Sequence, residues 1–316
     1  MRSAARAARK FAGLLRRKSA YLAAFLLLAL VLRLAWRDTM AWTAPTFYAL
    51  PLPAHTAAWL VLALLLWKTW RRALLCVLAA GVMSGLWWRN TQQLCRDIAA
   101  SGADGPRIFL WNIGHTATVP LALHELIAEL APDAVVLAEA ENLGAAGLAE
   151  LMKQHPGFRA VELQDGVSCL VRGSFTPPES RQLAWRVWIN LVTATFTRVP
   201  GEWRLCLSDI PPWPPLPRTA HLDAIRAAAG PAPRTIIAGD FNTPLDSAGF
   251  DPWRAQFHHG LADCAAWHAP LETWCFGAPL LAIDHIWMSR DLTPVRVRKE
   301  SRFGRDHAWL FVECGQ

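Results

Sequence analysis

The pattern of apolar and polar positions divides this chain into two parts of different character. In the first part, long apolar runs extend over about 21–36, 48–67 and 73–88, separated by short polar breaks. Each run is close to the ~20 residues that a helix needs to cross a bilayer, and Trp residues near the run ends suit the membrane interface. The pattern predicts a membrane anchor with three transmembrane helices at 1–90, a linker at 91–104 and a folded domain at 105–316.

Charge along the first part predicts how it crosses the membrane. Of the 32 Lys and Arg residues in the chain, 13 precede residue 91, together with a single acid, Asp38. The basic stretches at 1–18 and 68–72 are expected to stay in the cytoplasm, so that three spans place the domain after Trp88 on the extracytoplasmic side. This predicts a multi-pass membrane protein that contacts the lipid bilayer. A cleaved signal peptide is the alternative for the first run, and buried helices of a soluble protein are the alternative for all three.

From about residue 107 onward, short strand-like runs alternate with amphipathic helical segments. Consecutive strands imply antiparallel pairing and strand-helix alternation implies crossovers, so the second part is expected to be a mixed, layered α/β domain. The expected strands are 107–113, 134–139, 167–171, 186–196, 203–207, 236–238, 281–288, 295–299 and 309–313, and the expected helices are 119–130, 143–154 and 218–229.

Polar residues interrupt these apolar runs at their ends. They are Asn112, Glu139, Asp240 with Asn242, Asp284 followed by His285, and Asp306 followed by His307. Each alone is explained by capping or turn formation. Together they provide the carboxylate and amide oxygens that Mg²⁺ or Mn²⁺ prefers, and histidines that can pair with an acid.

In this order the motifs resemble those of the endonuclease/exonuclease/phosphatase superfamily. The matching stretches are W-N-I at 111–113, P-D-A-V-V-L-A-E at 132–139, G-D-F-N-T-P at 239–244, I-D-H-I at 283–286 and R-D-H at 305–307. The resemblance implies a four-layer α/β sandwich of two mixed sheets flanked by helices, and metal-dependent hydrolysis of a phosphate ester. The basic-flanked apolar runs also resemble those of membrane-anchored bacterial members, which implies a location in the bacterial plasma (inner) membrane.

The resemblance also implies a role for each matching residue. Glu139 would be the principal ligand of Mg²⁺ or Mn²⁺, with Asn112 and Asp306 near the metal and the phosphate. Asp284 would orient His307, and His307 would stabilise the charge of the transition state. Asp240, with Asn242, would position or deprotonate the attacking water.

One position departs from the family pattern. Where the family usually has a histidine after the strand at 203–207, this chain has Asp209, and a carboxylate cannot donate a hydrogen bond to phosphate as an imidazolium can. Activity would then be reduced, altered, or dependent on a second cation held by Asp209, unless His221 substitutes. A catalytically weak binding or sensor domain that keeps the fold is therefore the alternative function.

The composition of the second part favours some substrates over others. After residue 90, acids outnumber Lys and Arg by five, which favours a lipid headgroup or a small phosphodiester over nucleic acid as the phosphate-ester substrate, although a nuclease remains open. The loops at 211–217 and 248–272 are expected to set specificity, and His258 and His259 to be solvated loop residues. Cys264 and Cys275 flank a loop and are a candidate disulfide in an oxidising compartment.

Overall fold

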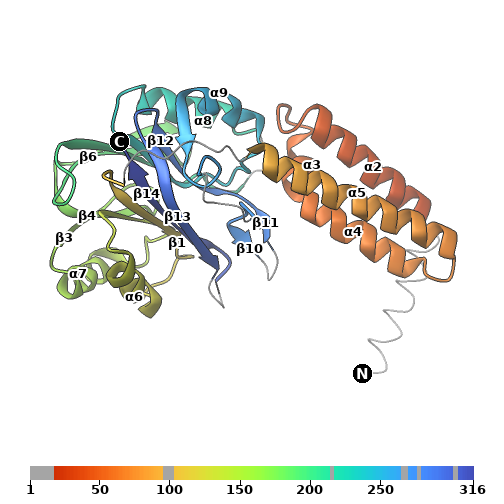
Figure 1. The fold of residues 1–316 in the computed structure, drawn as a ribbon, viewed down its shortest axis with the longest axis horizontal. Helices are drawn as coiled ribbons and strands as arrows, with labels where there is room; N and C mark the ends of the chain where they lie inside the picture. Colours follow the sequence, from red (N-terminus) through yellow and green to blue (C-terminus); the bar gives the residue numbers. More distant parts are fainter. Residues whose placement is uncertain (1–17, 95–102, 214–216, 265–269, 276–278, 302–304) are drawn as a thin grey trace. The chain divides into compact units, whose positions relative to one another are not determined.

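The computed structural model describes residues 18–94, 103–213, 217–264, 270–275, 279–301 and 305–316 (Figure 1). The chain forms two compact units, one within Met1–Gln92 and one made of Gln93–Pro214 and Arg218–Gln316. The basic flank predicted at 1–17 lies outside the described residues. Each unit has its own core, and the two are described separately below.

The first unit is helical. It contains α2 (Ser19–Ala35), α3 (Ala44–Ala49), α4 (Leu52–Leu65) and α5 (Trp70–Leu94). Of the described helices, only the stretch Trp70–Thr91 within α5 is long and apolar enough to cross a membrane, while α2 and α4 are shorter apolar helices. At 1.5 Å per residue, a 17-residue helix such as α2 reaches only about 25 Å, less than the ~30 Å hydrocarbon core. The structure therefore supplies one candidate span where the sequence predicts three.

This helical unit turns most of its large apolar side chains outward. Among the described residues, 20 exposed large hydrophobic side chains lie between Tyr21 and Trp88, and three lie in the rest of the chain. Two charged groups are instead enclosed: Arg33 is buried and donates to the carbonyl of Phe47 at 2.6 Å, and Tyr48 donates to the buried Asp38 at 2.9 Å. Lys68, Arg71, Arg72 and Arg89 are exposed. The distribution is the reverse of that in the second unit.

The second unit is a mixed α/β structure. Its strands are β1 (Arg107–Asn112), β2 (Ala134–Ala138), β3 (Phe158–Glu162), β4 (Ser168–Phe175), β5 (Glu179–Ala184), β6 (Val187–Phe196), β7 (Glu202–Leu207), β8 (Thr235–Asp240), β9 (Phe257–His259), β10 (Trp274–Cys275), β11 (Pro279–Leu281), β12 (Asp284–Ser289), β13 (Thr293–Ser301) and β14 (Ala308–Gly315). Its helices are α6 (Leu121–Leu130), α7 (Gly144–Gln154), α8 (Thr219–Ala229), the 3₁₀ turn η1 (Ala248–Phe250) and α9 (Asp251–Gln256). The predicted strands and helices are present. The predicted loop at 248–272 is wrong in part, because it contains η1, α9 and β9.

The strands join in the order β13-β14-β1-β2-β4-β6-β7-β8-β12-β9, with β3 and β5 pairing at the sides. The resemblance implied two separate sheets, whereas hydrogen bonding here is continuous through β4, which pairs with β2 over 168–171 and with β6 over 173–175. Gly173 lies between these segments at φ 142°, and a Cβ there would come within 2.1 Å of the Thr195 carbonyl oxygen. Only glycine allows this change of partner.

Successive side chains along a strand point to opposite faces of the sheet, and each face contributes to a different hydrophobic core. In β1, Phe109 and Trp111 join a core that includes Leu126 of α6 and Leu151 of α7. Ile108 and Leu110 point to the other face and join the larger core, which includes residues of β6, β7, β8, α8 and α9. Figure 1 shows α6 and α7 on one side of the strands and α8 and α9 on the opposite side. The mixed α/β prediction is confirmed.

The register brings the polar strand ends to one edge. β1 and β2 are parallel and end together, with Asn112 beside Ala138. β7 and β8 are also parallel, and β12 runs antiparallel to β8 so that its first residue, Asp284, lies beside Asp240. Ligand sites of α/β proteins form where such strand ends meet.

Candidate active site

The turn after β8 owes its shape to Gly239. Its φ is 154°, and a Cβ at this position would lie 1.7 Å from the Ser208 carbonyl oxygen. Gly239 thus lets the segment after β7 come close to β8, where Ile210 N–H donates to the Asp240 carbonyl at 2.8 Å. Asp240 is held at the bottom of this junction, fully buried.

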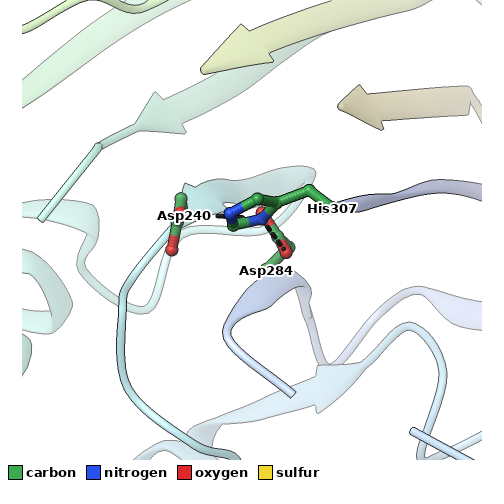
Figure 2. Close-up of side chains that lie close together, drawn as sticks. All are labelled: Asp240, Asp284 and His307. Atoms are coloured by element: carbon green, nitrogen blue, oxygen red, sulfur yellow. Dashed lines mark hydrogen bonds and ion pairs between the residues drawn. The ribbon is translucent and has the colours of Figure 1, made fainter. Parts of the chain in front are cut away.

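Asp240, Asp284 and His307 come together from β8, from β12 and from the residue before β14. Figure 2 shows the His307 ring beside both carboxylates. The Nδ1 atom of His307 is 2.9 Å from Asp284 Oδ2 and 3.9 Å from Asp240 Oδ2. Asp284 therefore fixes the ring, with Nδ1–H donating to it, and the described residues provide no partner for Nε2. That leaves Nε2 available to a substrate.

Burial and charge set the protonation of these groups. Burial would lower the pKa of His307, but the charge and hydrogen bond of Asp284, with the charges of Asp240 and Asp306, raise it to about 10. Burial, together with the charge of Asp284, raises the pKa of Asp240 to about 8, although His307 and hydrogen bonds from Asn242 and Asn112 oppose this. The ligand atoms of the three residues lie within 4.8 Å of one another, a spacing that would suit a metal. A protonated imidazole has no lone pair for a metal, so the cluster suits acid-base chemistry better.

Two asparagines orient the Asp240 carboxylate. Asn112 Nδ2 donates to Oδ2 at 2.9 Å while its own Oδ1 accepts from Gly114 N–H at 2.9 Å. The backbone N–H of Asn242 donates to Oδ1 at 2.7 Å. The Asn242 carboxamide points elsewhere, donating to the Ile210 carbonyl at 2.8 Å. Asn242 thus stabilises the turn that follows β8.

Thr273 positions the acid that holds His307. Its buried hydroxyl accepts from the N–H groups of Ile283 and Asp284, at 3.1 and 3.0 Å. Its carbonyl accepts from Ala308 N–H at 2.7 Å, on the strand that follows His307. One residue outside the predicted site therefore ties together both members of the Asp284–His307 pair.

The three predicted metal ligands surround the turn at 112–115. Glu139 has a left-handed backbone (φ 50°), its carbonyl accepts from His115 N–H at 2.8 Å, and its carboxylate lies 3.2 Å from His115 Nε2. Asp306 is exposed, and its side chain lies near the turn: its Oδ1 would be 4.0 Å from a Cβ atom built on Gly114. Asn112 begins the turn. Oxygen donors of this kind fit a hard cation such as Mg²⁺.

Asp209 lies between Glu139 and Asp240. It is 8% exposed, and its Oδ2 accepts from Glu139 N–H at 3.3 Å. Burial, reinforced by the charges of Asp240, Glu139 and Asp165, raises its pKa well above the usual range. The arrangement places Asp209, the residue that departs from the family pattern, beside both Glu139 and Asp240. The alternative, His221, lies in α8 and is not among the residues lining the cavity described next.

A cavity of about 370 Å³ opens beside Asp209 and Glu139. His115, Glu141, Asp165 and Arg186 also line it, and none of them was a predicted site residue. His115 and Glu141 lie in connections from a strand to a helix, and Asp165 and Arg186 lie in turns between two strands. Periodicity gives no signal at such positions. His115 also pairs through Nδ1 with Glu141.

His258 and His259 correct an expectation of the sequence. Both belong to β9, which pairs with β12, and both are buried. His259 Nδ1 accepts from Ala262 N–H at 3.0 Å, so its Nε2–H must donate to His285 Nδ1 at 3.0 Å. His285 Nε2–H then donates to the Thr243 carbonyl at 2.8 Å. Burial lowers the pKa of both rings, which keeps them neutral, and the chain of bonds supports the turn after Asp240.

The candidate disulfide stays a prediction. Cys264 is buried, and the side chain of Cys275 lies outside the described residues.

Comparisons with known proteins agree with this geometry. A model of the Endonuclease/Exonuclease/phosphatase family matches residues 109–307. Similar solved structures include TDP2 of D. rerio humanized by 14 mutations (17% identity, TM-score 0.51, 67% of this chain and 100% of that chain). The mannosyl-6-phosphatase of Bacteroides thetaiotaomicron (12%, 0.51, 66% and 99%) and the catalytic domain of human Nocturnin (15%, 0.52, 70% and 96%) are also similar. The TM-scores show a shared fold, and at these low identities the similarity concerns the fold alone. Comparison with curated protein sequences gave no match.

Proposed function

Because this chain belongs to the endonuclease/exonuclease/phosphatase family, we propose that it is a membrane-anchored phosphoesterase that depends on a divalent metal. The observation that carries this is the cluster of Asp240, Asp284 and His307, which joins a buried carboxylate to a histidine fixed by a second carboxylate. A phosphodiester or phosphomonoester is the substrate class. TDP2 and a mannosyl-6-phosphatase share the fold, which supports this class without choosing within it.

Each residue has a distinct task in this proposal. Asp240, oriented by Asn112 and by Asn242 N–H, holds the attacking water and accepts its proton. His307, protonated and fixed by Asp284, donates from Nε2 to a phosphate oxygen as negative charge develops.

Glu139, Asn112 and Asp306 would hold Mg²⁺ or Mn²⁺. The metal, when bound, supplies charge neutralisation at the phosphate.

The distribution of apolar side chains in the helical unit supports membrane anchoring. Many of its large apolar side chains are exposed, while Arg33, Asp38 and His55 are buried, which suits a lipid environment. With the basic segment at 68–72 kept in the cytoplasm, a crossing by the Trp70–Thr91 stretch of α5 places the α/β unit on the extracytoplasmic side. Reporter enzymes fused after Gln316 test this: a fusion active only in the cytoplasm contradicts the proposed sidedness.

Hydrolysis of bis(p-nitrophenyl) phosphate by the full chain in detergent tests the chemistry, with Mg²⁺ and with EDTA. Asp240→Asn and His307→Gln should each lose about 10²–10⁴-fold in kcat, the usual effect of removing an acid or base. Glu162→Gln, at an exposed position of β3, is the matched control. Equal hydrolysis rates in the wild type and all variants would refute the proposal. Absence of turnover in every phosphoester, together with Mg²⁺-dependent thermal stabilisation, favours the binding or sensor alternative.

A further inference from the structure

Large apolar side chains are exposed at three positions in the described part of the α/β unit. They are Leu121, Trp185 and Trp213, which are 82%, 74% and 74% exposed. Single exposed apolar residues are common on protein surfaces, so each alone needs no explanation. These three share a location, because each belongs to a connection at the edge of the strands where the candidate active site lies.

Trp185 lies in the turn between β5 and β6. β6 runs antiparallel to β7, with Asn190 opposite Leu207, so the start of β6 lies beside the end of β7. The end of β7 is at the active-site edge, because β7 is parallel to β8 and Asp209 follows it. Arg186, the next residue after Trp185, lines the same cavity as Asp209. Trp185 therefore lies next to the rim of this cavity.

Trp213 follows β7 at the same edge. The two residues before it, Pro211 and Pro212, line the cavity. The buried side chain of Arg218, just before α8, donates from Nη2 to the carbonyls of both prolines, at 2.9 and 2.7 Å. The backbone that presents Trp213 to solvent is thus held in place by hydrogen bonds.

Leu121 is the first residue of α6. This helix follows the connection after β1 that contains Gly114 and His115, and it leads back to the start of β2, which is parallel to β1. The amino end of α6 therefore lies at the edge where β1 ends with Asn112. All three exposed side chains are at the active-site edge.

A lipid bilayer is the partner that fits this edge. Trp is enriched at membrane–water interfaces, where its ring enters the apolar layer and its N–H stays hydrated. The guanidinium of Arg186 lies 5.6 Å from the centre of the Trp185 ring, which suits the adjacent layer of lipid phosphates. Only fifteen residues separate Thr91, the end of the candidate span, from Arg107 of β1. Such a segment reaches at most ~55 Å when fully extended, so it keeps a bilayer within reach.

A protein partner fits this edge less well. The centre of an interface between proteins is a continuous apolar core. The three side chains come from separate connections and have polar neighbours such as His115 and Arg186, so among the described residues they form no such core. A bilayer needs no continuous patch, because each aromatic ring can enter the interfacial layer separately.

We propose that the active-site edge of the α/β unit docks on the bilayer surface through Trp185, Trp213 and Leu121. The inference rests on the proposed membrane anchoring. The mouth of the cavity then faces the lipid surface, and the docked edge gives the chain a second contact with the membrane besides its anchor.

Spin-label depth measurements on the full chain in phosphatidylcholine vesicles test this docking. A nitroxide attached at Trp185→Cys or Trp213→Cys should lie about 5–10 Å into the boundary between headgroups and acyl chains, the depth of interfacial apolar side chains. It should therefore be more accessible to O₂ than to a water-soluble nickel chelate. The control is Glu202→Cys, at the exposed first residue of β7 on the opposite edge, where the nickel chelate should be favoured. The unsubstituted chain, treated with the same reagent, measures the background from the native cysteines.

Flotation with the same vesicles separates this inference from the anchoring. Chains that float, but whose labels at positions 185 and 213 are as accessible to water as the label at 202, overturn the docking and leave the anchoring intact. Chains that remain in solution refute the anchoring, and the docking with it. Spin–spin broadening between labels on different copies would assign the edge to a second copy and also overturn the inference. None of these results depends on phosphoester hydrolysis, which is measured separately.

Discussion

Replacing Thr273 by Val should damage both the stability and the activity of the α/β unit. The two side chains have nearly the same shape, but Val has no oxygen to accept the N–H groups of Ile283 and Asp284. Thr273 is fully buried, so water cannot replace that oxygen. The substitution therefore leaves two buried donors without acceptors, and it does so at the first residue of the strand that carries Asp284.

The size of the effect follows from these two bonds. An unsatisfied buried N–H costs about 1–3 kcal/mol, which gives roughly 2–6 kcal/mol for the pair. For a domain of this size that corresponds to about 4–24 °C in the midpoint of thermal unfolding. A displacement of Asp284 by about 1 Å would also misplace His307 and can lower kcat ~10²-fold.

Thermal unfolding followed by Trp fluorescence, and hydrolysis of bis(p-nitrophenyl) phosphate, measure the two effects on the full chain. Thr273→Ser is the matched control, because it keeps the hydroxyl and removes only a methyl group, at about 1 kcal/mol. The reasoning is refuted where Thr273→Val unfolds at the wild-type temperature. It is equally refuted where Thr273→Ser is as harmful, since packing and not hydrogen bonding would then be responsible.

Three further predictions concern the frame of the site and its metal. Gly239→Ala should prevent cooperative folding, because the new Cβ would lie 1.7 Å from the Ser208 carbonyl oxygen, whereas Gly85→Ala, with no atom within 4 Å, should unfold normally by circular dichroism. His259→Leu leaves Ala262 N–H and His285 Nδ1 unpaired and should cost roughly 2–6 kcal/mol of stability, seen as a lower unfolding midpoint; an unchanged midpoint would show that these two hydrogen bonds do not stabilise the fold. EDTA should abolish phosphoester hydrolysis, excess Mg²⁺ should restore it, and Glu139→Gln should raise the Mg²⁺ concentration needed for half activity about tenfold or more; full activity in EDTA would contradict a metal role.

The sequence predicted the parts of the site that end apolar strands. Asn112, Asp240 and Asp284 each interrupt a hydrophobic run, and the register brings such interruptions to one edge. His115 and Asp165 follow no periodic element, so no pattern placed them at the cavity. His259 was expected in solvent because a three-residue strand such as β9 has too few positions to show alternation, and only its pairing with β12 reveals its burial.

The helical unit was less predictable for a different reason. Apolar runs measure hydrophobicity, but turns determine helix length, and α4 ends at Leu65 with only 14 residues. Strands β3 and β5 were missed because their exposed faces break up the hydrophobic pattern, as in Glu179–Ala184, where no residue is fully buried.

The pairing of β1 with β14 bears on how the protein is made. Arg107 pairs with Glu313 in this ladder, so an interior strand of the α/β unit finds its neighbour some two hundred positions later in synthesis. His307 stands just before that late strand, while Asn112 ends the early one. During synthesis β1 would have one unpaired edge, and long-range pairing of this kind is slow and prone to aggregation. The candidate active site would be among the last features to form, so a chain interrupted before β14 would lack it.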